Sequence, residues 1–266
     1  MQNTPTILDE ILNTKRLELL RAKAFTSCVE LECQAAARHD FRNLTDRLAR
    51  PGVQIIAEIK RASPSCGDIR TNLDVAATAY SYAAGDAAAL SVLTEPHYFK
   101  GSKADLQQAR QVVSLPILRK DFIIDPYQVY ESVVMGADAI LLIVRILDDQ
   151  QLHTLYQLAL QLGLDVVIEI FDEHDAQRAL ALGAKLIGIN NRNLADFTTD
   201  SNHAHQLAKL LRPETITIAF SGLHSSADII NLLRHDIRHF LIGTALVRQT
   251  DPTATLQEWA KLTAAT

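Results

Sequence analysis

Glu58 and Lys60 stand two positions apart at the end of the apolar run Val53-Gln-Ile-Ile-Ala-Glu58-Ile-Lys60. Side chains of a β-strand point alternately to its two faces, so a strand here would place Ile56, Glu58 and Lys60 on the same face. Charges on a face that also carries core residues need a partner or a function, because burying an unpaired charge is costly. A carboxylate and an ammonium group this close can also hold each other's protonation state, as acid and base catalysis requires.

Other apolar runs also end in polar side chains, and these are further candidates for such a site. They are Lys120, Glu169, Asn190 and Arg192. Taken singly, each has an ordinary structural explanation: Lys120 could be a solvated residue at a strand end, with Glu169 as its salt-bridge partner. Their arrival in phase at the same end of several strands is harder to attribute to chance, so we interpret them together as a functional site.

The chain after residue 52 alternates short apolar runs with stretches of helical spacing. The expected strands are residues 53–60, 88–93, 116–120, 137–144, 165–170, 184–190, 215–221 and 239–243. The expected helices are residues 74–84, 102–113, 126–135, 148–162, 173–182, 201–211, 225–234 and 254–265. Strands that alternate with single helices pair in parallel through crossovers, and eight such units match a (β/α)8 TIM barrel. An open doubly wound sheet is the main alternative, but no G-x-G-x-x-G turn follows the first strand.

In a parallel barrel the active site lies at the carboxyl ends of the strands, where the polar residues above are expected. The last two runs end there in small residues, Ser221-Gly222 and Gly243-Thr244. Small residues before a helix leave backbone N–H groups able to bind an anion. These turns are therefore candidate phosphate sites, although plain tight turns would have the same composition.

The first 50 residues precede the barrel and are expected to be helical. Thr6 can cap a helix whose apolar residues gather near one face, and a second, weaker helix is expected at residues 30–38. A segment of about 50 residues supplies little core of its own. We therefore predict one domain over residues 1–266, with residues 1–50 as a helical extension packed over the barrel proper at residues 53–266.

The composition argues against several classes of partner. The 266 residues carry a formal net charge of −5 with scattered Lys and Arg, which gives no reason to expect nucleic acid or an anionic membrane. The chain has neither a signal-like leader nor a run of about 20 apolar residues, so we expect a cytoplasmic protein. We expect a monomer or a weak dimer. Its three cysteines form no CxxC pair and are expected to be free thiols.

A metal hydrolase is an alternative suggested by His203-Ala-His205, which could pose as a pair of metal ligands. These histidines fall in an expected helix, where positions i and i+2 do not share a face. We therefore interpret them as surface histidines and expect no metal site.

Several segments together resemble the indole-3-glycerol phosphate synthase family. They are Ile56-Ala-Glu58-Ile-Lys60-Arg-Ala-Ser63-Pro-Ser65, Leu93-Thr-Glu95, Tyr98-Phe-Lys-Gly-Ser102, Lys120-Asp-Phe-Ile-Ile-Asp-Pro126, Gly188-Ile-Asn-Asn-Arg192-Asn-Leu194 and Ile242-Gly-Thr-Ala-Leu246. The resemblance covers nearly the whole chain, in order, and includes the leading helix. It implies a carboxy-lyase of tryptophan biosynthesis, which closes 1-(2-carboxyphenylamino)-1-deoxyribulose 5-phosphate to indole-3-glycerol phosphate with loss of carbon dioxide and water.

The same resemblance implies roles for the residues at the strand ends. Lys120 looks like the acid that protonates the ribulose carbonyl, and Glu58, Lys60 and Glu169 are candidates for the donor and base of the dehydration. The implied catalytic residues are Glu58, Lys60, Lys120, Glu169, Asn190 and Ser221. The implied substrate-binding residues are Ser63, Arg192, Gly222, Gly243 and Thr244. The expected partner is a phosphorylated small molecule, and the chemistry needs neither a metal nor an organic cofactor.

The chain departs from the family pattern at Phe220, where the family usually has Glu before Ser-Gly, and in smaller ways at Cys66 and Thr244. Phe220 is out of phase with Ser221, so its ring is expected to turn partly toward the helix layer. The departure leaves open an alternative, a weakly active or repurposed paralogue that binds a related phosphorylated ligand. A sugar-phosphate isomerase is another, but it leaves the set of two lysines and two glutamates unexplained.

Overall fold

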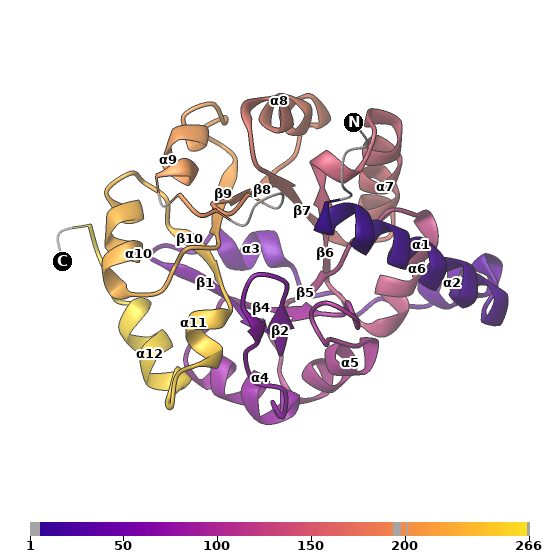
Figure 1. Cartoon of the computed structure of the whole chain (residues 1–266), viewed down its shortest axis with the longest axis horizontal. Coiled ribbons are helices and arrows are strands. Elements are labelled where there is room, and N and C mark those ends of the chain that lie inside the picture. The colour runs from indigo at the N-terminus through magenta and orange to yellow at the C-terminus, as the bar shows by residue number, and fades with distance from the viewer. Residues whose placement is uncertain (1–5, 194–197, 201, 265–266) are drawn as a thin grey trace.

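Eight parallel strands close into a barrel in the structure, a computed structural model that describes residues 6–193, 198–200 and 202–264. The strands are β1 (Gln54–Ile59), β4 (Ala89–Leu93), β5 (Ile117–Lys120), β6 (Ala139–Ile143), β7 (Asp165–Ile170), β8 (Leu186–Asn190), β9 (Ile216–Phe220) and β10 (His239–Ile242). β1 pairs with both β4 and β10, which closes the ring (Figure 1). The eight predicted strands and the (β/α)8 barrel are confirmed.

Helices follow the strands and form an outer layer around the barrel (Figure 1). They are α4 (Val75–Ala84), α5 (Lys103–Val112), α6 (Pro126–Met135), α7 (Asp149–Gln161), α8 (Glu173–Leu182), α9 (His203–Ala208), α10 (Ser226–Leu233) and α12 (Pro252–Trp259). Their ends follow from local chemistry. Asp125 caps α6 ahead of Pro126 at the first helical position, and Gly136 and Gly183 end α6 and α8 in the left-handed conformation. No helix in the described part of the chain is both long and apolar enough to cross a membrane.

Three local details differ from the expected elements. α9 is shorter than the helix expected at 201–211, because the chain after Ala208 continues in tighter turns, in which the Leu210 and Leu211 N–H groups donate to carbonyls three residues earlier; residue 201 itself lies outside the described residues. A 3-10 turn, η1 (Val144–Ile146), extends β6, and a short helix, α11 (Thr244–Val247), follows β10. The three cysteines have no disulfide, as predicted.

Apolar side chains form two layers, one on each face of the closed sheet. Ile55, Ala57 and Ile59 of β1 belong to the layer between strands and helices, whereas Ile56 faces the barrel interior and Glu58 lines the cavity at its mouth. The interior layer also contains Ala89, Leu118, Leu141, Val167, Leu186, Ile218 and Leu241. The alternation predicted for β1 is therefore confirmed, with Glu58 on the interior side.

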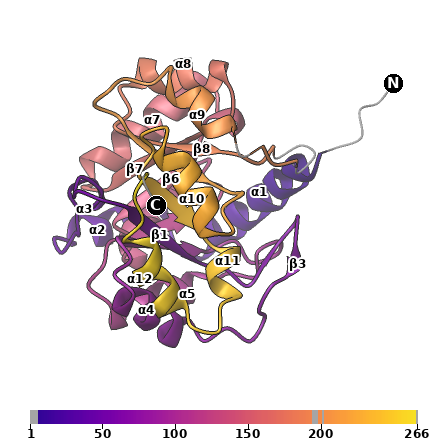
Figure 2. The same cartoon turned by 90° about the vertical axis from the view of Figure 1, so that its left-hand side faces the viewer.

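In the described part of the chain, from residue 6 on, three helices precede β1 and reach both ends of the barrel. They are α1 (Ile7–Phe25), α2 (Cys28–Ala36) and α3 (Leu44–Leu48). At the amino ends of the strands, the Leu44 N–H donates to Asp165 Oδ2 at 2.7 Å, and Leu48 is fully buried in the interior layer. At the carboxyl ends, α1 places Ile11 and Leu12 in the same layer, and Figure 2 shows α1 and α3 on opposite sides of the molecule. α3 thus closes the base of the barrel while α1 covers its mouth.

A buried ion pair attaches α1 to the end of β5. Lys15 Nζ lies 2.9 Å from Asp121 Oδ1 and 2.6 Å from Glu18 Oε2. Asp121 also accepts a hydrogen bond from Thr94 at 2.6 Å and lies 3.0 Å from Arg119. Burial alone would raise the pKa of Asp121, but the charges of Arg119 and Lys15 outweigh it and hold the pKa well below its usual range.

We expect Lys15→Met to lower the free energy of unfolding by about 2 kcal/mol at pH 7, because the buried Asp121 carboxylate loses one of its charged partners. The folded pKa of Asp121 is depressed, so this contribution is present above the pKa of an unfolded aspartate and is lost as the pH falls toward the folded value. Urea unfolding of parent and variant at several pH values between 5 and 2 checks both points. Lys23→Met is the control, since Lys23 pairs with Asp125 at 2.7 Å but is much more exposed, and it should cost less than about 1 kcal/mol. Equal losses in the two variants would contradict the anchoring role.

Candidate active site

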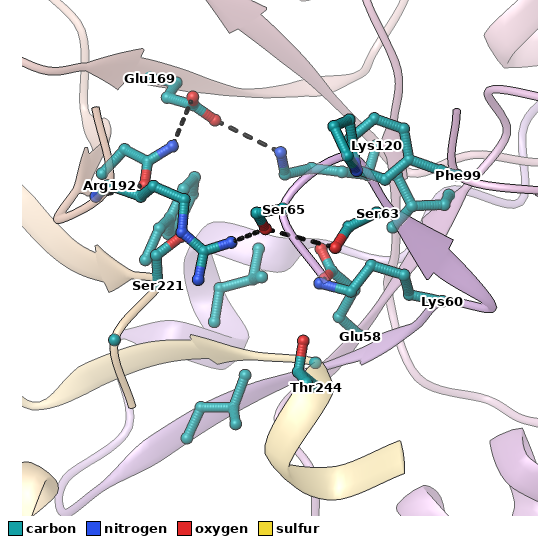
Figure 3. Close-up of a pocket in the computed structure, with 18 of the residues that line it drawn as sticks. Glu58, Lys60, Ser63, Ser65, Phe99, Lys120, Glu169, Arg192, Ser221 and Thr244 are labelled. Carbon is teal, nitrogen blue, oxygen red and sulfur yellow. Dashed lines mark hydrogen bonds and ion pairs between the residues drawn. The ribbon is translucent and has the colours of Figure 1, made fainter. Parts of the chain in front are cut away.

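The carboxyl ends of the strands surround a cavity, covered in part by α1 and by a small hairpin after β1. The hairpin consists of β2 (Ala62–Ser63) and β3 (Gly67–Asp68). All eleven residues predicted for the site line this cavity, and they come from six different strands or the loops that follow them. They are Glu58, Lys60, Ser63, Lys120, Glu169, Asn190, Arg192, Ser221, Gly222, Gly243 and Thr244. Figure 3 shows the labelled members of this set directed into one shared space.

Glu58 and Lys60 form a close ion pair on the side of the cavity next to β10. Lys60 Nζ lies 2.6 Å from Glu58 Oε1, and Glu58 is only 4% exposed. The glycine that follows β10 makes room for this carboxylate, because a Cβ on Gly243 would lie 2.4 Å from Glu58 Oε1. The Glu58 carboxylate is thus fixed against β10 and holds the Lys60 ammonium group at the cavity.

A second chain of polar groups lies across the cavity from the first. Lys120 Nζ lies 3.3 Å from Glu169 Oε2, and the other oxygen of Glu169 accepts a hydrogen bond from Asn190 Nδ2 at 3.1 Å (Figure 3). The Asn190 Oδ1 in turn accepts the backbone N–H of Arg192 at 3.0 Å. Glu169 and Asn190 are buried, whereas the Lys120 side chain keeps a fifth of its surface exposed to the cavity. Lys120 can therefore present a proton to a bound molecule while Glu169 balances its charge.

Arg192 links the end of β8 to the hairpin after β1. Its guanidinium group donates to the Ser65 hydroxyl (Figure 3), and Nε donates to Thr199 Oγ1 at 3.3 Å. Ser65 Oγ also lies 3.4 Å from Ser63 Oγ. Ser65 is a site residue that the sequence did not assign, although it belongs to the Ser-Pro-Ser segment of the resemblance. A cation and two hydroxyls thus face the cavity from this side.

The hairpin also contains Cys66, whose backbone N–H donates to Ser63 Oγ at 3.2 Å. Burial would raise the pKa of the Cys66 thiol, but hydrogen bonds from Ser65 and Ser63 and the charges of Arg192 and Lys60 lower it below its usual value.

Unusual backbone geometry follows β9. Ser221 has φ +64° and Gly222 has φ +72°, so two consecutive residues adopt the left-handed conformation. Such a conformation is costly for a residue other than glycine, and residues held in it are found at functional sites as well as in turns. Gly243 precedes α11, whose first turn receives no side-chain cap, whereas α10 is capped by Ser225. These two turns are the ones predicted to bind phosphate, and both line the cavity.

Apolar residues form the wall of the cavity on the side of α1. They are Ile7, Leu8, Ile11, Leu93, Phe99, Phe122 and Ile143. The sequence did not assign these residues to the site, because an apolar side chain on a covering helix has the same pattern as one in a core. Two of them, Phe99 and Phe122, lie in segments that resemble the family, and this was the signal in the sequence that could have assigned them to the site. The wall suits an aromatic ring, while the charged groups suit its polar substituents.

The expected orientation of Phe220 is wrong. Its ring belongs to the interior layer with Ile218, is 2% exposed and lines the cavity instead of turning to the helices. β9 ends at Phe220, and the left-handed geometry of Ser221 breaks the alternation from which the orientation was inferred. Both Phe220 and Ser221 therefore reach the cavity.

The two histidines of α9 contact separate aromatic rings. His203 lies 4.7 Å from the Phe171 ring, and His205 stacks on His235 at 4.1 Å, measured between ring centroids. Among the described residues, one group has a spacing that could suit a metal, formed by Asp172, His174 and Asp175. It lies outside the cavity lining, and Arg145 pairs with two of its carboxylates.

Comparison with known proteins decides the family. The sequence matches the family model for indole-3-glycerol phosphate synthase over residues 8–259. This chain belongs to the indole-3-glycerol phosphate synthase family. It is 48% identical over 256 residues to the indole-3-glycerol phosphate synthase of Desulfosudis oleivorans, covering 95% of this chain and 97% of that protein. It is 44% identical to the synthase of Bordetella pertussis, covering 92% and 95% of the two chains.

Solved structures of other enzymes share the fold. A thiamine phosphate pyrophosphorylase from Pyrococcus furiosus superposes with a TM-score of 0.60 at 14% identity, covering 82% of this chain and 96% of that one. A 3-hexulose-6-phosphate synthase from Salmonella typhimurium does so with a TM-score of 0.60 at 12% identity, covering 78% and 97%. At such low identity the likeness shows the barrel fold alone. The family and the fold predicted from the sequence are confirmed, and the chain is a carboxy-lyase of this family.

Proposed function

We propose that this chain closes 1-(2-carboxyphenylamino)-1-deoxyribulose 5-phosphate to indole-3-glycerol phosphate with the residues of this cavity. The observation that carries the proposal is the presence of two separate lysine–glutamate pairs around one space, Lys120 with Glu169 and Lys60 with Glu58. The reaction moves protons in two stages, and each stage needs a donor and a counter-charge. A site with a single carboxylate and a single acid could supply the proton transfers of only one stage.

Ring closure is the first stage. The aryl carbon that bears the carboxylate attacks the ribulose carbonyl carbon, and Lys120 donates a proton to the carbonyl oxygen as the carbon–carbon bond forms. The Glu169 carboxylate lies 3.3 Å from Lys120 Nζ and balances the charge of the ammonium group. Carbon dioxide then leaves, and the electron pair of its bond returns to the ring. The substrate carbonyl accepts the electrons, so this stage balances without an external oxidant.

Dehydration is the second stage. The hydroxyl formed from the carbonyl must leave as water, which needs a proton, and the neighbouring carbon must lose a proton to a base. Lys60, Glu58 and Glu169 are the groups around the cavity that can supply this donor and base. Their placement on opposite sides of the cavity allows one proton to be given and another to be taken without competition for a single group.

The remaining polar residues suit the ends of the substrate. Ser63, Gly222, Gly243 and Thr244 surround the position we propose for the phosphate, where backbone N–H groups and hydroxyls can donate hydrogen bonds. Arg192 suits the carboxylate, because its planar guanidinium group can make paired hydrogen bonds. The apolar wall then receives the aryl ring.

We expect Arg192→Ala to raise KM by about 10- to 100-fold with a much smaller change in kcat, since it removes charge-assisted hydrogen bonds made mainly to the bound substrate. Steady-state kinetics followed by indole fluorescence measures both constants. Arg145→Ala is the control, because Arg145 pairs with Asp172 at 3.1 Å outside the cavity lining and should leave KM unchanged. A large fall in kcat at constant KM would refute a binding role for Arg192.

The alternative function, a repurposed paralogue, is favoured only by Phe220 and Cys66. Incubation of the purified chain with the anilino-deoxyribulose phosphate, with indole fluorescence as readout, separates the two functions. Turnover supports the synthase, whereas calorimetric binding without turnover supports the paralogue. We further propose that the enzyme acts in the cytoplasm as a single-domain monomer or weak dimer, which light scattering at several protein concentrations tests for the oligomeric state.

A further inference from the structure

The ring of Phe220 occupies a space that exists because residue 188 has no side chain. Asn190 of β8 pairs with Phe220 of β9, which brings the ring over Gly188 two residues earlier. A Cβ on Gly188 would lie 2.3 Å from Cζ of the ring and 2.6 Å from Cε2, closer than real Cβ contacts allow. The position of the ring is therefore fixed by the neighbouring strand.

Lys120 faces this ring from the other side of the cavity. Its Nζ lies 5.8 Å from the ring centroid, within the range of about 6 Å in which an ammonium group is attracted to the face of an aromatic ring. Phe220 is 2% exposed, so water competes little for the ring side of this contact. Glu169, at 3.3 Å, is the carboxylate that pairs with Lys120 among the described residues. The lysine side chain has four rotatable bonds, and one carboxylate leaves it free to swing about that contact.

We propose that Phe220 is a positioning residue for Lys120, its ring face holding the ammonium group in the orientation that protonates the substrate carbonyl. Lys120 is then held by a carboxylate on one side and by an aromatic face on the other. Gly188 contributes to the same arrangement, because the absence of a side chain there leaves the space that the ring occupies. The kinetic part of this inference rests on the proposed acid role of Lys120, whereas the contact itself does not.

The contact is tested without turnover by NMR of the lysine side chains. The ε-methylene resonance that disappears in Lys120→Ala belongs to Lys120, and a ring face above it should shift its protons upfield. We expect the shift in the parent protein and its loss in Phe220→Leu. A resonance at the ordinary lysine position in the parent protein overturns the inference. The shift in a protein that shows no turnover supports the contact and rejects the proposed function instead.

The positioning role is tested by kinetics. Phe220→Leu is expected to lower kcat by about five- to tenfold, with KM changed less than about threefold. Gly188→Ala should lower kcat by a similar factor because it displaces the ring, and adding it to Phe220→Leu should cause little further loss. Losses that multiply in the double variant overturn the role. The control is Phe99→Leu, which also removes an aromatic ring from the cavity wall. This variant should raise KM, because the wall is proposed to receive the aryl ring of the substrate. It should not lower kcat as Phe220→Leu does, because no cation contact is found on Phe99 among the described residues.

Replacement of Phe220 by fluorinated phenylalanine tests the positioning role even if Phe220→Leu or Gly188→Ala folds poorly. Fluorine at one and then both ortho positions of Phe220 withdraws electron density from the ring face and leaves the para edge against Gly188 unchanged. We expect kcat to fall stepwise with each fluorine at constant melting temperature. An unchanged kcat across this series rejects the positioning role, since a ring that only fills space would be insensitive to its electron density.

Discussion

Lys120→Ala should lower kcat by about 10²- to 10⁴-fold, because it removes the proposed general acid of ring closure. Lys120 lies at the end of β5 and lines the cavity, with its ammonium group 3.3 Å from the buried Glu169, where a substrate carbonyl can reach it. KM should change far less, since binding of phosphate and carboxylate depends on other residues of the cavity. Single-turnover measurements with the fluorescent product separate the chemical step from product release.

Two matched variants make this expectation specific. Lys185→Ala removes an exposed lysine that directly precedes β8 and does not line the cavity, and it should leave kcat unchanged. Lys120→Arg keeps the charge but replaces a compact ammonium group by a planar, weakly acidic guanidinium group, and it should recover little activity. Near-normal turnover of Lys120→Ala would remove Lys120 from the mechanism.

The barrel could be predicted because its sequence pattern is local and repeated. Each strand is a short apolar run, and helices such as α6 begin at a capping residue, Asp125, and end at a glycine, Gly136. The polar residues of the site could be predicted for the same reason: each ends a strand, and parallel strands bring their carboxyl ends to one rim. Alternation along β1 even placed Glu58 on the interior side.

The parts that could not be predicted depend on tertiary contacts or on irregular backbone. Nothing local in α1 distinguishes a helix that lines a cavity from one that packs on a surface, although Ile7, Leu8 and Ile11 all reach the site. The orientation of Phe220 was inferred by counting alternate residues from Ser221, and that count fails where Ser221 turns left-handed. The space beside Gly188 that admits the ring is visible only when β8 and β9 are paired.

The substitution at Phe220 also changes the charge around the reacting groups. The cavity is lined by Lys60, Lys120 and Arg192 against the carboxylates of Glu58 and Glu169, so among the described lining residues cations exceed anions by one, excluding His224. A carboxylate at position 220 would remove this excess. The substrate carries both a carboxylate and a phosphate, and a cavity with excess positive charge favours its binding. Phe220 is therefore compatible with the synthase reaction. With phenylalanine at this position, the Lys120 ammonium group is oriented by Glu169 and by the aromatic ring.

Glu169→Gln should lower kcat by about 10²- to 10³-fold, because Glu169 is the buried carboxylate that balances Lys120 in ring closure and is a candidate base for the dehydration. The present carboxylate accepts hydrogen bonds at both oxygens, from Lys120 Nζ at 3.3 Å and from Asn190 Nδ2 at 3.1 Å. A glutamine amide has one oxygen, so one of these donors would face an NH₂ group. The variant therefore loses both the counter-charge of Lys120 and one hydrogen bond, while its volume stays the same.

The pH dependence of kcat distinguishes a base from a residue that only fills space. If Glu169 accepts the proton of the dehydration, the acid limb of the kcat profile should disappear in Glu169→Gln, since that limb reports an essential base. Glu173→Gln is the control, because Glu173 is exposed in the first turn of α8 and outside the cavity lining, and the profile should keep its limb. If the Glu169→Gln variant keeps the acid limb and its kcat is lower by the same factor at every pH, Glu169 acts only as the partner of Lys120. The base is then assigned to Glu58.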